Sequence, residues 1–175
     1  MMTTADAPGA TRDQLSLFIE GPGGDCMNTL RRQLDPIQAS LIPAHVTLCR
    51  EDELDGLTPE VIATRLAGAA PVSLCFGVPE RFGGHGILLP CIAGQVEFDA
   101  LRRRALAQPT VRQQSAHVTL AHPRNPRSAG NHLPAMDTRL IAAFAAVRWI
   151  RQVGTSPWQT LMRVALAGPP QASRC

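Results

Sequence analysis

The chain has 175 residues, of which 45% are hydrophobic and 18% charged, a composition typical of a folded globular domain. All 17 basic residues are arginine, and the missing lysine excludes Schiff-base chemistry, a Walker-loop lysine and the lysine–nucleotide intermediate of ATP-dependent ligases. The formal charge of +3 is compatible with an anionic substrate, but it is too small to indicate an extended nucleic-acid surface.

The cysteines and the apolar runs indicate the cellular compartment of the protein. Five cysteines, an odd number, occur without any Cys-x-x-Cys pair, which favours reduced thiols. The start of the chain has no apolar core segment, and the longest apolar run, residues 140–147, is too short to span a bilayer. We therefore expect a cytoplasmic protein without membrane association, and no feature requires a cofactor or an obligate protein partner.

In chain order, hydrophobic periodicity predicts alternating strands and helices between two tails. The expected elements are a tail at residues 1–13, a strand at 14–20, a helix at 26–38, a strand at 42–49, a helix capped by Thr58 and begun by Pro59, a strand at 72–78, a glycine-rich link at 76–87, a strand at 86–92, a helix at 98–110, a strand over residues 117–120, a helix at 136–146, strands at 147–153 and 158–166, and a tail at 168–175.

The tetrapeptide His-Val-Thr-Leu occurs twice, at residues 45–48 and 117–120. In a strand, successive side chains point to opposite faces, so His45 shares a face with Thr47, and His117 with Thr119. Two such strands side by side would place two imidazoles and two hydroxyls around one small anion. A neutral histidine can accept a proton while a protonated one donates, and the hydroxyls can bind phosphate oxygens. This pattern favours metal-free phosphodiester chemistry.

The two motifs also indicate an internal duplication, because the histidines are 72 positions apart. The same offset carries the first strand and helix onto apolar runs at residues 86–92 and 98–110. We therefore predict an α+β fold of two pseudo-symmetric lobes, each an antiparallel sheet backed by helices, with the active cleft between them. The single domain is expected at 14–167, with lobe-forming repeats at about 14–80 and 86–167.

The paired motifs resemble those of the two-histidine (2H) phosphoesterases, which include bacterial 2′,3′-cyclic phosphodiesterases and so-called 2′-5′ RNA ligases. The defining feature of that family is a pair of His-x-Thr/Ser motifs in two similar lobes. His45 with Thr47 and His117 with Thr119 match both motifs. The resemblance implies the same bilobal fold, two catalytic histidines, phosphate binding by the two threonines, and cleavage that leaves a 2′-phosphate.

The sequence thus predicts a metal-independent phosphodiesterase acting on a 2′,3′-cyclic phosphate of a nucleotide or an RNA end. Which histidine is base and which is acid stays open. The alternatives are an ATP-independent 2′-5′ RNA ligase, a non-catalytic module that binds RNA ends or nucleotides, and a duplicated scaffold without a site. A metal hydrolase is disfavoured, because no acidic residue accompanies either motif on its cleft face.

Other residues near the motifs are candidates for substrate contact. Arg50 and Arg124 follow the two motifs, and each is either a phosphate ligand or an exposed strand-end charge. Ser115 is in phase with the second motif and is expected to line the cleft, whereas His122 is out of phase and is expected to face away. Phe82, in the glycine-rich link, is either a stacking surface at the cleft rim or part of an ordinary turn.

Overall fold

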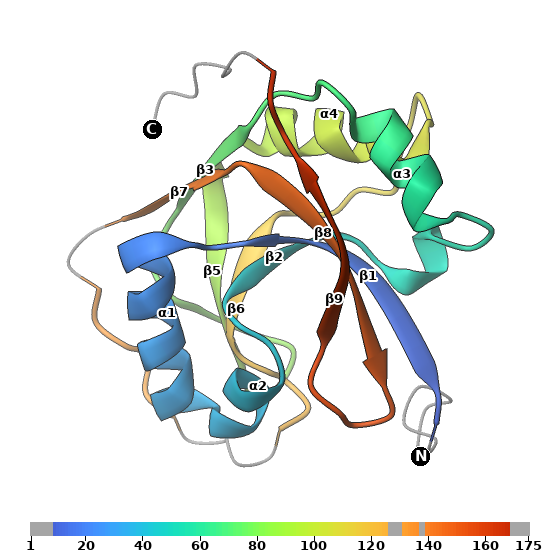
Figure 1. The fold of residues 1–175 in the computed structure, drawn as a ribbon. Coiled ribbons are helices and arrows are strands. Elements are labelled where there is room, and N and C mark those ends of the chain that lie inside the picture. The colour runs from blue at the N-terminus through green and yellow to red at the C-terminus, as the bar shows by residue number, and fades with distance from the viewer. Residues whose placement is uncertain (1–8, 126–130, 137–138, 169–175) are drawn as a thin grey trace.

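The computed structural model describes residues 9–125, 131–136 and 139–168 (Figure 1). Most of the two predicted tails lies outside these residues. Thr11, however, already begins the first strand, three residues before the predicted start. The elements are β1 (Thr11–Phe18), α1 (Gly21–Leu34), α2 (Pro36–Leu41), β2 (His45–Cys49), the 3-10 turn η2 (Glu51–Glu53), α3 (Pro59–Leu66), β3 (Val72–Phe76), β4 (Glu80–Phe82), β5 (Gly86–Ala93), α4 (Gln95–Leu106), β6 (His117–Ala121), β7 (Leu140–Phe144), β8 (Ala146–Val153) and β9 (Gln159–Ala165).

The helix ends follow local capping chemistry. Thr58 caps α3 as predicted, because its hydroxyl accepts a hydrogen bond from the Val61 amide at 3.4 Å. The single helix predicted at 26–38 is instead two helices, because Pro36 lacks an amide hydrogen and cannot continue the first one. Asp35 caps the second helix by accepting a hydrogen bond from the Gln38 amide at 3.1 Å.

The described strands form two antiparallel sheets. One has the order β2-β1-β8-β9; the other has the order β4-β5-β3-β7, with β6 also paired to β5. In Figure 1, α1 and α2 lie at the lower left and α3 and α4 at the upper right, while β2 and β6 run side by side at the centre and contact each other. The predicted α+β fold of two antiparallel sheets with helices is confirmed.

The predicted duplication is visible in the strand register. In the first pair, Leu17 is opposite Val46 and Phe18 opposite His45. In the second pair, residues 89 and 90 are opposite 118 and 117, each 72 positions later. Both pairs also carry a bulge at the same place, between residues 15 and 16 and between 87 and 88. The two motif strands are therefore held in equivalent positions in the two sheets.

The lobes do not follow the predicted repeat boundaries. Strand β3 falls in the first repeat, 14–80, yet it pairs with β5 and β7 in the second sheet. Strands β8 and β9 fall in the second repeat, 86–167, yet β8 pairs with β1 in the first sheet. Each sheet is completed by strands from the other half of the chain, because the edges of β1 and β5 that face away from the motif strands need partners for their backbone groups.

The helix predicted at 136–146 is wrong. Residues 140–144 form β7, which pairs with β3 along its whole length. Leu140, Ala142 and Phe144 are buried, whereas Ile141 is 63% exposed, so the segment has the two-residue period of a strand. Pairing with β3 outweighs the helix preference of its alanines.

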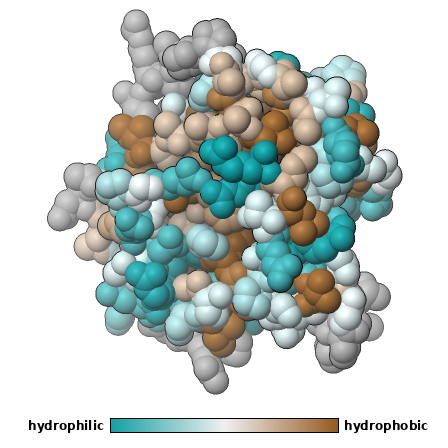
Figure 2. Space-filling view, viewed as in Figure 1, coloured by the Kyte–Doolittle hydropathy of each residue, from teal (hydrophilic) through white to brown (hydrophobic). Residues whose placement is uncertain are grey.

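The core lies on the apolar faces of the motif strands. Val46, Leu48, Val118 and Leu120 are all fully buried, together with neighbouring leucines of β1 and β5. On the molecular surface, by contrast with this apolar core, hydrophilic and hydrophobic residues are interspersed over the face shown in Figure 2. The alternation predicted from the tetrapeptides is thus confirmed, with Val and Leu inside and His and Thr half-buried on the other face.

Candidate active site

The two histidines have equivalent local surroundings. The Nδ1 of His45 lies 2.8 Å from the Pro43 carbonyl oxygen, and the Nδ1 of His117 lies 2.9 Å from the Ser115 carbonyl oxygen. A carbonyl only accepts, so each Nδ1 carries the hydrogen, and each Nε2 is left to exchange a proton. This arrangement suits a general acid or a general base equally well.

An aromatic ring packs near each imidazole. The Phe18 ring centre is 5.8 Å from that of His45, and the Phe82 ring centre is 6.1 Å from that of His117. Phe82 belongs to β4, and with β5 it forms the hairpin expected from the glycine-rich link. Its ring therefore supports a motif histidine, a role that sequence reasoning did not distinguish from an ordinary turn.

The surroundings of His45 favour its neutral form. Burial is the main cause, because it penalises the charged ring and lowers the pKa of His45 from 6.5 to about 4. The positive charges of Arg31 and of protonated His117 lower this pKa further, while the hydrogen bond to Pro43 opposes the shift. The two motif histidines are therefore within electrostatic reach of each other.

The two threonines are fixed by groups from other elements. Thr47 Oγ1 accepts a hydrogen bond from Gln14 Nε2 at 3.1 Å, which leaves its own hydrogen available to a ligand. Its backbone carbonyl accepts from Gln114 Nε2 at 2.6 Å. The Thr119 carbonyl accepts from the Nε of buried Arg31 at 3.1 Å. Because Arg31 is in α1 and Thr119 in β6, this bond ties the two lobes together beside the site.

An open cleft of about 940 Å³ lies over this region. It is lined by His45, Thr47, Thr119, Gln14, Arg31, Arg12, Asp13, Arg50, Glu51, Asp52, His122, Arg124, Asn125, Gln152, Trp158, Ile37, Gln38, Leu41, Ile42 and Leu120. Three of the four motif side chains thus share the cleft wall. His117 is not among the lining residues and lies half-buried against Phe82.

The secondary candidates divide into two groups. Arg50 and Arg124 are exposed and line the cleft. Ser115 does not line it; its side chain is exposed, β6 begins only at His117, and its contribution is the carbonyl that orients His117. Strand alternation predicts Ser115 on the cleft face, but β6 begins two residues later, so the alternation does not extend to Ser115.

His122 lies on the cleft wall, contrary to the prediction that it faces away. It follows the last residue of β6, so the alternation of the strand no longer fixes its direction. Its Nδ1 accepts a hydrogen bond from the Arg124 amide at 3.1 Å, and its own amide donates to Asp35 at 2.8 Å. Burial lowers the pKa of His122, and the charges of Arg124 and Arg12 lower it further, against the opposing effect of Asp35.

Sequence reasoning missed Arg12, Gln14, Gln152 and Trp158. Arg12 falls in the predicted tail and Gln14 at the start of the predicted strand, although Arg12, Gln14 and Ser16 alternate with Leu15 and Leu17 and so extend the strand backwards. Gln152 lies in β8, and Trp158 directly precedes β9. Both are far along the chain from Arg12, and only the pairing of β8 with β1 brings them to the cleft.

Among the described residues, no group of three or more His, Cys, Asp or Glu side chains is placed to hold a metal ion. No helix in the described ranges is long and apolar enough to cross a membrane.

Comparisons with known proteins show the fold. No known family profile matches the sequence, and no curated protein matches it. Among solved structures, E. coli LigT in apo form superposes with a TM-score of 0.55 at 15% identity, covering 90% of this chain and 98% of that one. E. coli LigT complexed with 3′-AMP gives 0.53 at 17%, covering 89% and 98%.

A structure described as a phosphoesterase gives a TM-score of 0.53 at 16% identity, covering 91% of this chain and 99% of that one. The chain therefore has the LigT-like fold over most of its length. The resemblance expected from the twin motifs is confirmed at the level of the fold.

Proposed function

We propose that the chain is a two-histidine phosphoesterase that hydrolyses a 2′,3′-cyclic phosphate of a nucleotide or an RNA end without a metal ion. The observation that carries this proposal is the pseudo-symmetric pair of motifs: both histidines present the same Nδ1 hydrogen bond, in strands of matching register. The LigT-like fold supports a phosphoesterase, and the E. coli LigT complex with 3′-AMP supports a nucleotide ligand.

The low pKa of His45 supports His45 as the general base. A ring that is neutral at neutral pH acts as general base, so His45 Nε2 takes a proton from the attacking water. The water oxygen bonds to phosphorus as the bond to the ribose 3′ oxygen breaks, and His117 Nε2 gives that oxygen its proton. The product is a 2′-phosphate. A phosphate bound nearby raises the pKa of His45, because an opposite charge favours the protonated ring, and this strengthens the base during turnover.

The threonines hold the phosphoryl oxygens in this mechanism. Gln14 donates to Thr47 Oγ1, so the Thr47 hydroxyl is turned to donate to a non-bridging oxygen. Thr119 takes the equivalent role from the other lobe, and Arg31 fixes its backbone. In this proposal both hydroxyls donate to the non-bridging oxygens, on which charge builds in the transition state, and so lower the barrier.

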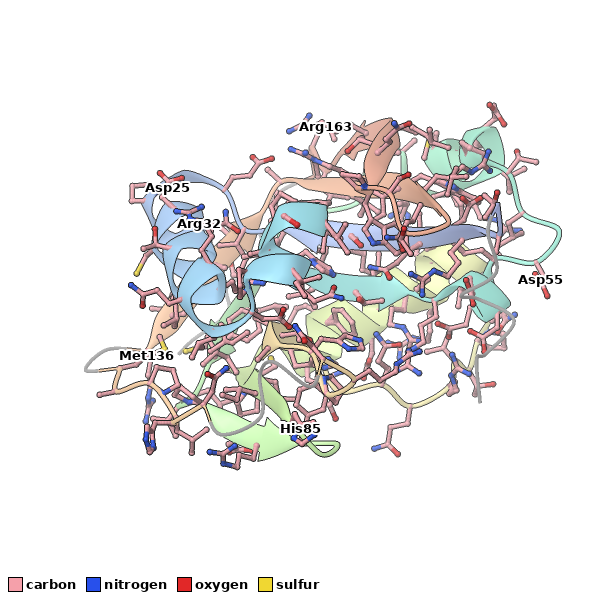
Figure 3. The ribbon with its side chains drawn as sticks, turned by 90° about the horizontal axis from the view of Figure 1, so that it is seen from below. Asp25, Arg32, Asp55, His85, Met136 and Arg163 are labelled. Carbon is pink, nitrogen blue, oxygen red and sulfur yellow. The ribbon has the colours of Figure 1, made fainter. Side chains whose placement is uncertain are left out.

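The decisive experiment is incubation of the pure protein with the four 2′,3′-cyclic mononucleotides in the presence of EDTA, with identification of the monophosphate formed. We expect a 2′-monophosphate. His45→Ala and His117→Ala should each lower kcat by roughly 10²-fold or more, since each removes one proton transfer. His85→Ala, which removes an exposed imidazole from the β4–β5 turn, is the matched control (Figure 3).

Several outcomes would contradict the proposal. Loss of activity in EDTA would indicate a metal enzyme. Nucleotide binding without turnover would indicate a binding module, and formation of 2′-5′ linkages in preference to hydrolysis would indicate a ligase. The pH profile tests the roles: with His45 as base, kcat/KM falls as the pH drops toward about 4, whereas with His45 as acid it would fall as the pH rises above that value.

A further inference from the structure

Arg12 is held in a fixed position on the cleft wall by uncharged groups. Its Nη2 donates to Gln152 Oε1, and its guanidinium carbon lies 5.5 Å from the centre of the Trp158 ring. Gln152 is itself fixed, because its Nε2 donates to the Ser156 carbonyl at 2.8 Å. All three side chains line the cleft. The guanidinium is thus oriented in advance without having its charge neutralised.

Arg12 also retains hydrogen-bonding capacity. Its Nε is buried and has no hydrogen-bond partner. A guanidinium has five N–H donors in a planar fork that matches the oxygens of a phosphate. A buried donor without a partner is unfavourable, so the folded chain bears a cost at this side chain.

The charges around the cleft favour an anion as the ligand. Two of its acidic residues are already paired with arginines from outside its lining: Asp13 with Arg151 at 2.7 Å, and Asp52 with Arg112 at 2.8 Å. By contrast, none of the four lining arginines forms an ion pair with a carboxylate among the described residues. Arg31 donates to backbone carbonyls, and the other three are Arg12, Arg50 and Arg124. Glu51 also lines the cleft and is exposed, so the balance stays positive.

The opposite lobe contributes charge at the same place. Arg12, Arg124 and His122 line the same cleft, the Arg124 amide donates to His122 Nδ1, and both arginines lower the pKa of His122. Arg12 comes from β1, while Arg124 follows β6, so a ligand between them would touch both lobes.

The spacing along β1 places Arg12 beside the proposed catalytic phosphate. Arg12 and Gln14 are two residues apart and on one face of the strand, or about 6.8 Å along it. Gln14 contacts Thr47, which holds the first phosphate in the proposed mechanism. A second anion at Arg12 would therefore lie next to the first, not at a remote surface.

We propose that Arg12, with Arg124 opposite, forms a second phosphate subsite, and that the preferred substrates carry a second phosphate group next to the reacting one. This inference rests on the proposed function, because that function has Thr47 bind the reacting phosphate. The second group is either the 5′-phosphate of a nucleotide or the preceding phosphodiester of an oligonucleotide, since both present the same oxygens to a guanidinium.

Titration calorimetry with three ligands tests the subsite without catalysis. The ligands are 3′-AMP, adenosine 3′,5′-bisphosphate, and the dinucleotide ApA with a 3′-phosphate. We expect one or both of the two-phosphate ligands to bind roughly tenfold tighter than 3′-AMP or better, as a charge-assisted bidentate contact provides. The ligand with the larger gain identifies the source of the second phosphate.

Two substitutions assign the gain to Arg12. Arg12→Gln should abolish it, whereas Arg163→Gln, which removes an exposed arginine of β9 outside the cleft lining, should keep it (Figure 3). Arg12→Lys, which keeps the charge but loses the planar fork, should retain part of the gain, and it carries the test if Arg12→Gln fails to melt cooperatively.

The result that overturns the inference is a wild-type protein that binds all three ligands equally, or an Arg12→Gln variant that keeps the gain. An equal loss in Arg163→Gln would also overturn it, because general electrostatics would then explain the preference. The two proposals fail separately. A binding gain without hydrolysis supports the second phosphate subsite and contradicts the proposed phosphodiesterase activity. Hydrolysis without a binding gain supports the activity and contradicts the subsite.

Discussion

Replacing His45 by glutamine should make the protein more resistant to mild acid. The folded state lowers the pKa of this ring from 6.5 to about 4, so between these values the unfolded chain binds a proton that the folded chain does not. The free energy of unfolding therefore falls as the pH drops from 6.5 toward 4. Glutamine cannot titrate, so the variant escapes this loss.

The size of the effect follows from the shift itself. At roughly pH 4.5 a group with these two pKa values costs the folded state about 2.5 kcal/mol. Solvent reaches part of the half-buried ring and screens its charge, so we expect about 1–2.5 kcal/mol. Carboxylates that titrate in the same range are common to both proteins and cancel in the comparison.

Urea unfolding at about pH 7 and about pH 4.5 measures this difference for the wild type, His45→Gln and His85→Gln. The stability lost between the two pH values should be smaller in His45→Gln than in either the wild type or His85→Gln, which also removes one imidazole. Equal losses in all three proteins would refute the depressed pKa, and with it the assignment of His45 as the base.

Three further changes test the groups that support the site. Arg102→Met should lower the free energy of unfolding by about 3–5 kcal/mol in urea melts, because it removes a fully buried guanidinium that pairs with Glu53 and donates to the Leu48 and Arg112 carbonyls. Gln14→Ala should lower kcat on a 2′,3′-cyclic nucleotide by roughly fivefold to tenfold, as one hydrogen bond orients Thr47; an unchanged kcat would mean that the hydroxyl is not so directed. Gly94→Ala should lower the melting temperature and cost about 1–3 kcal/mol, because the residue has φ +97° and a Cβ would lie 2.4 Å from the Ser73 carbonyl oxygen.

Local sequence was a reliable guide wherever burial followed a simple period. The repeated tetrapeptides placed Val and Leu in the core and His and Thr on the other face, and the offset of 72 matched the observed register of both strand pairs. It misled where a partner strand decided the outcome, as in residues 140–144. It also misled just outside β6, since neither Ser115 nor His122 follows the alternation of the strand between them.

What the sequence by itself determined was the chemistry: no lysine or tyrosine, and two His-x-Thr motifs on strands whose opposite faces must be buried. Tertiary structure alone decided which groups surround these motifs. Strand exchange between the halves brings β8 against β1, and with it Gln152 against Arg12, while Arg31 of α1 reaches the Thr119 carbonyl of β6. Such contacts join residues far apart in the chain, and they form because buried backbone edges and charged groups must find partners that local periodicity does not specify.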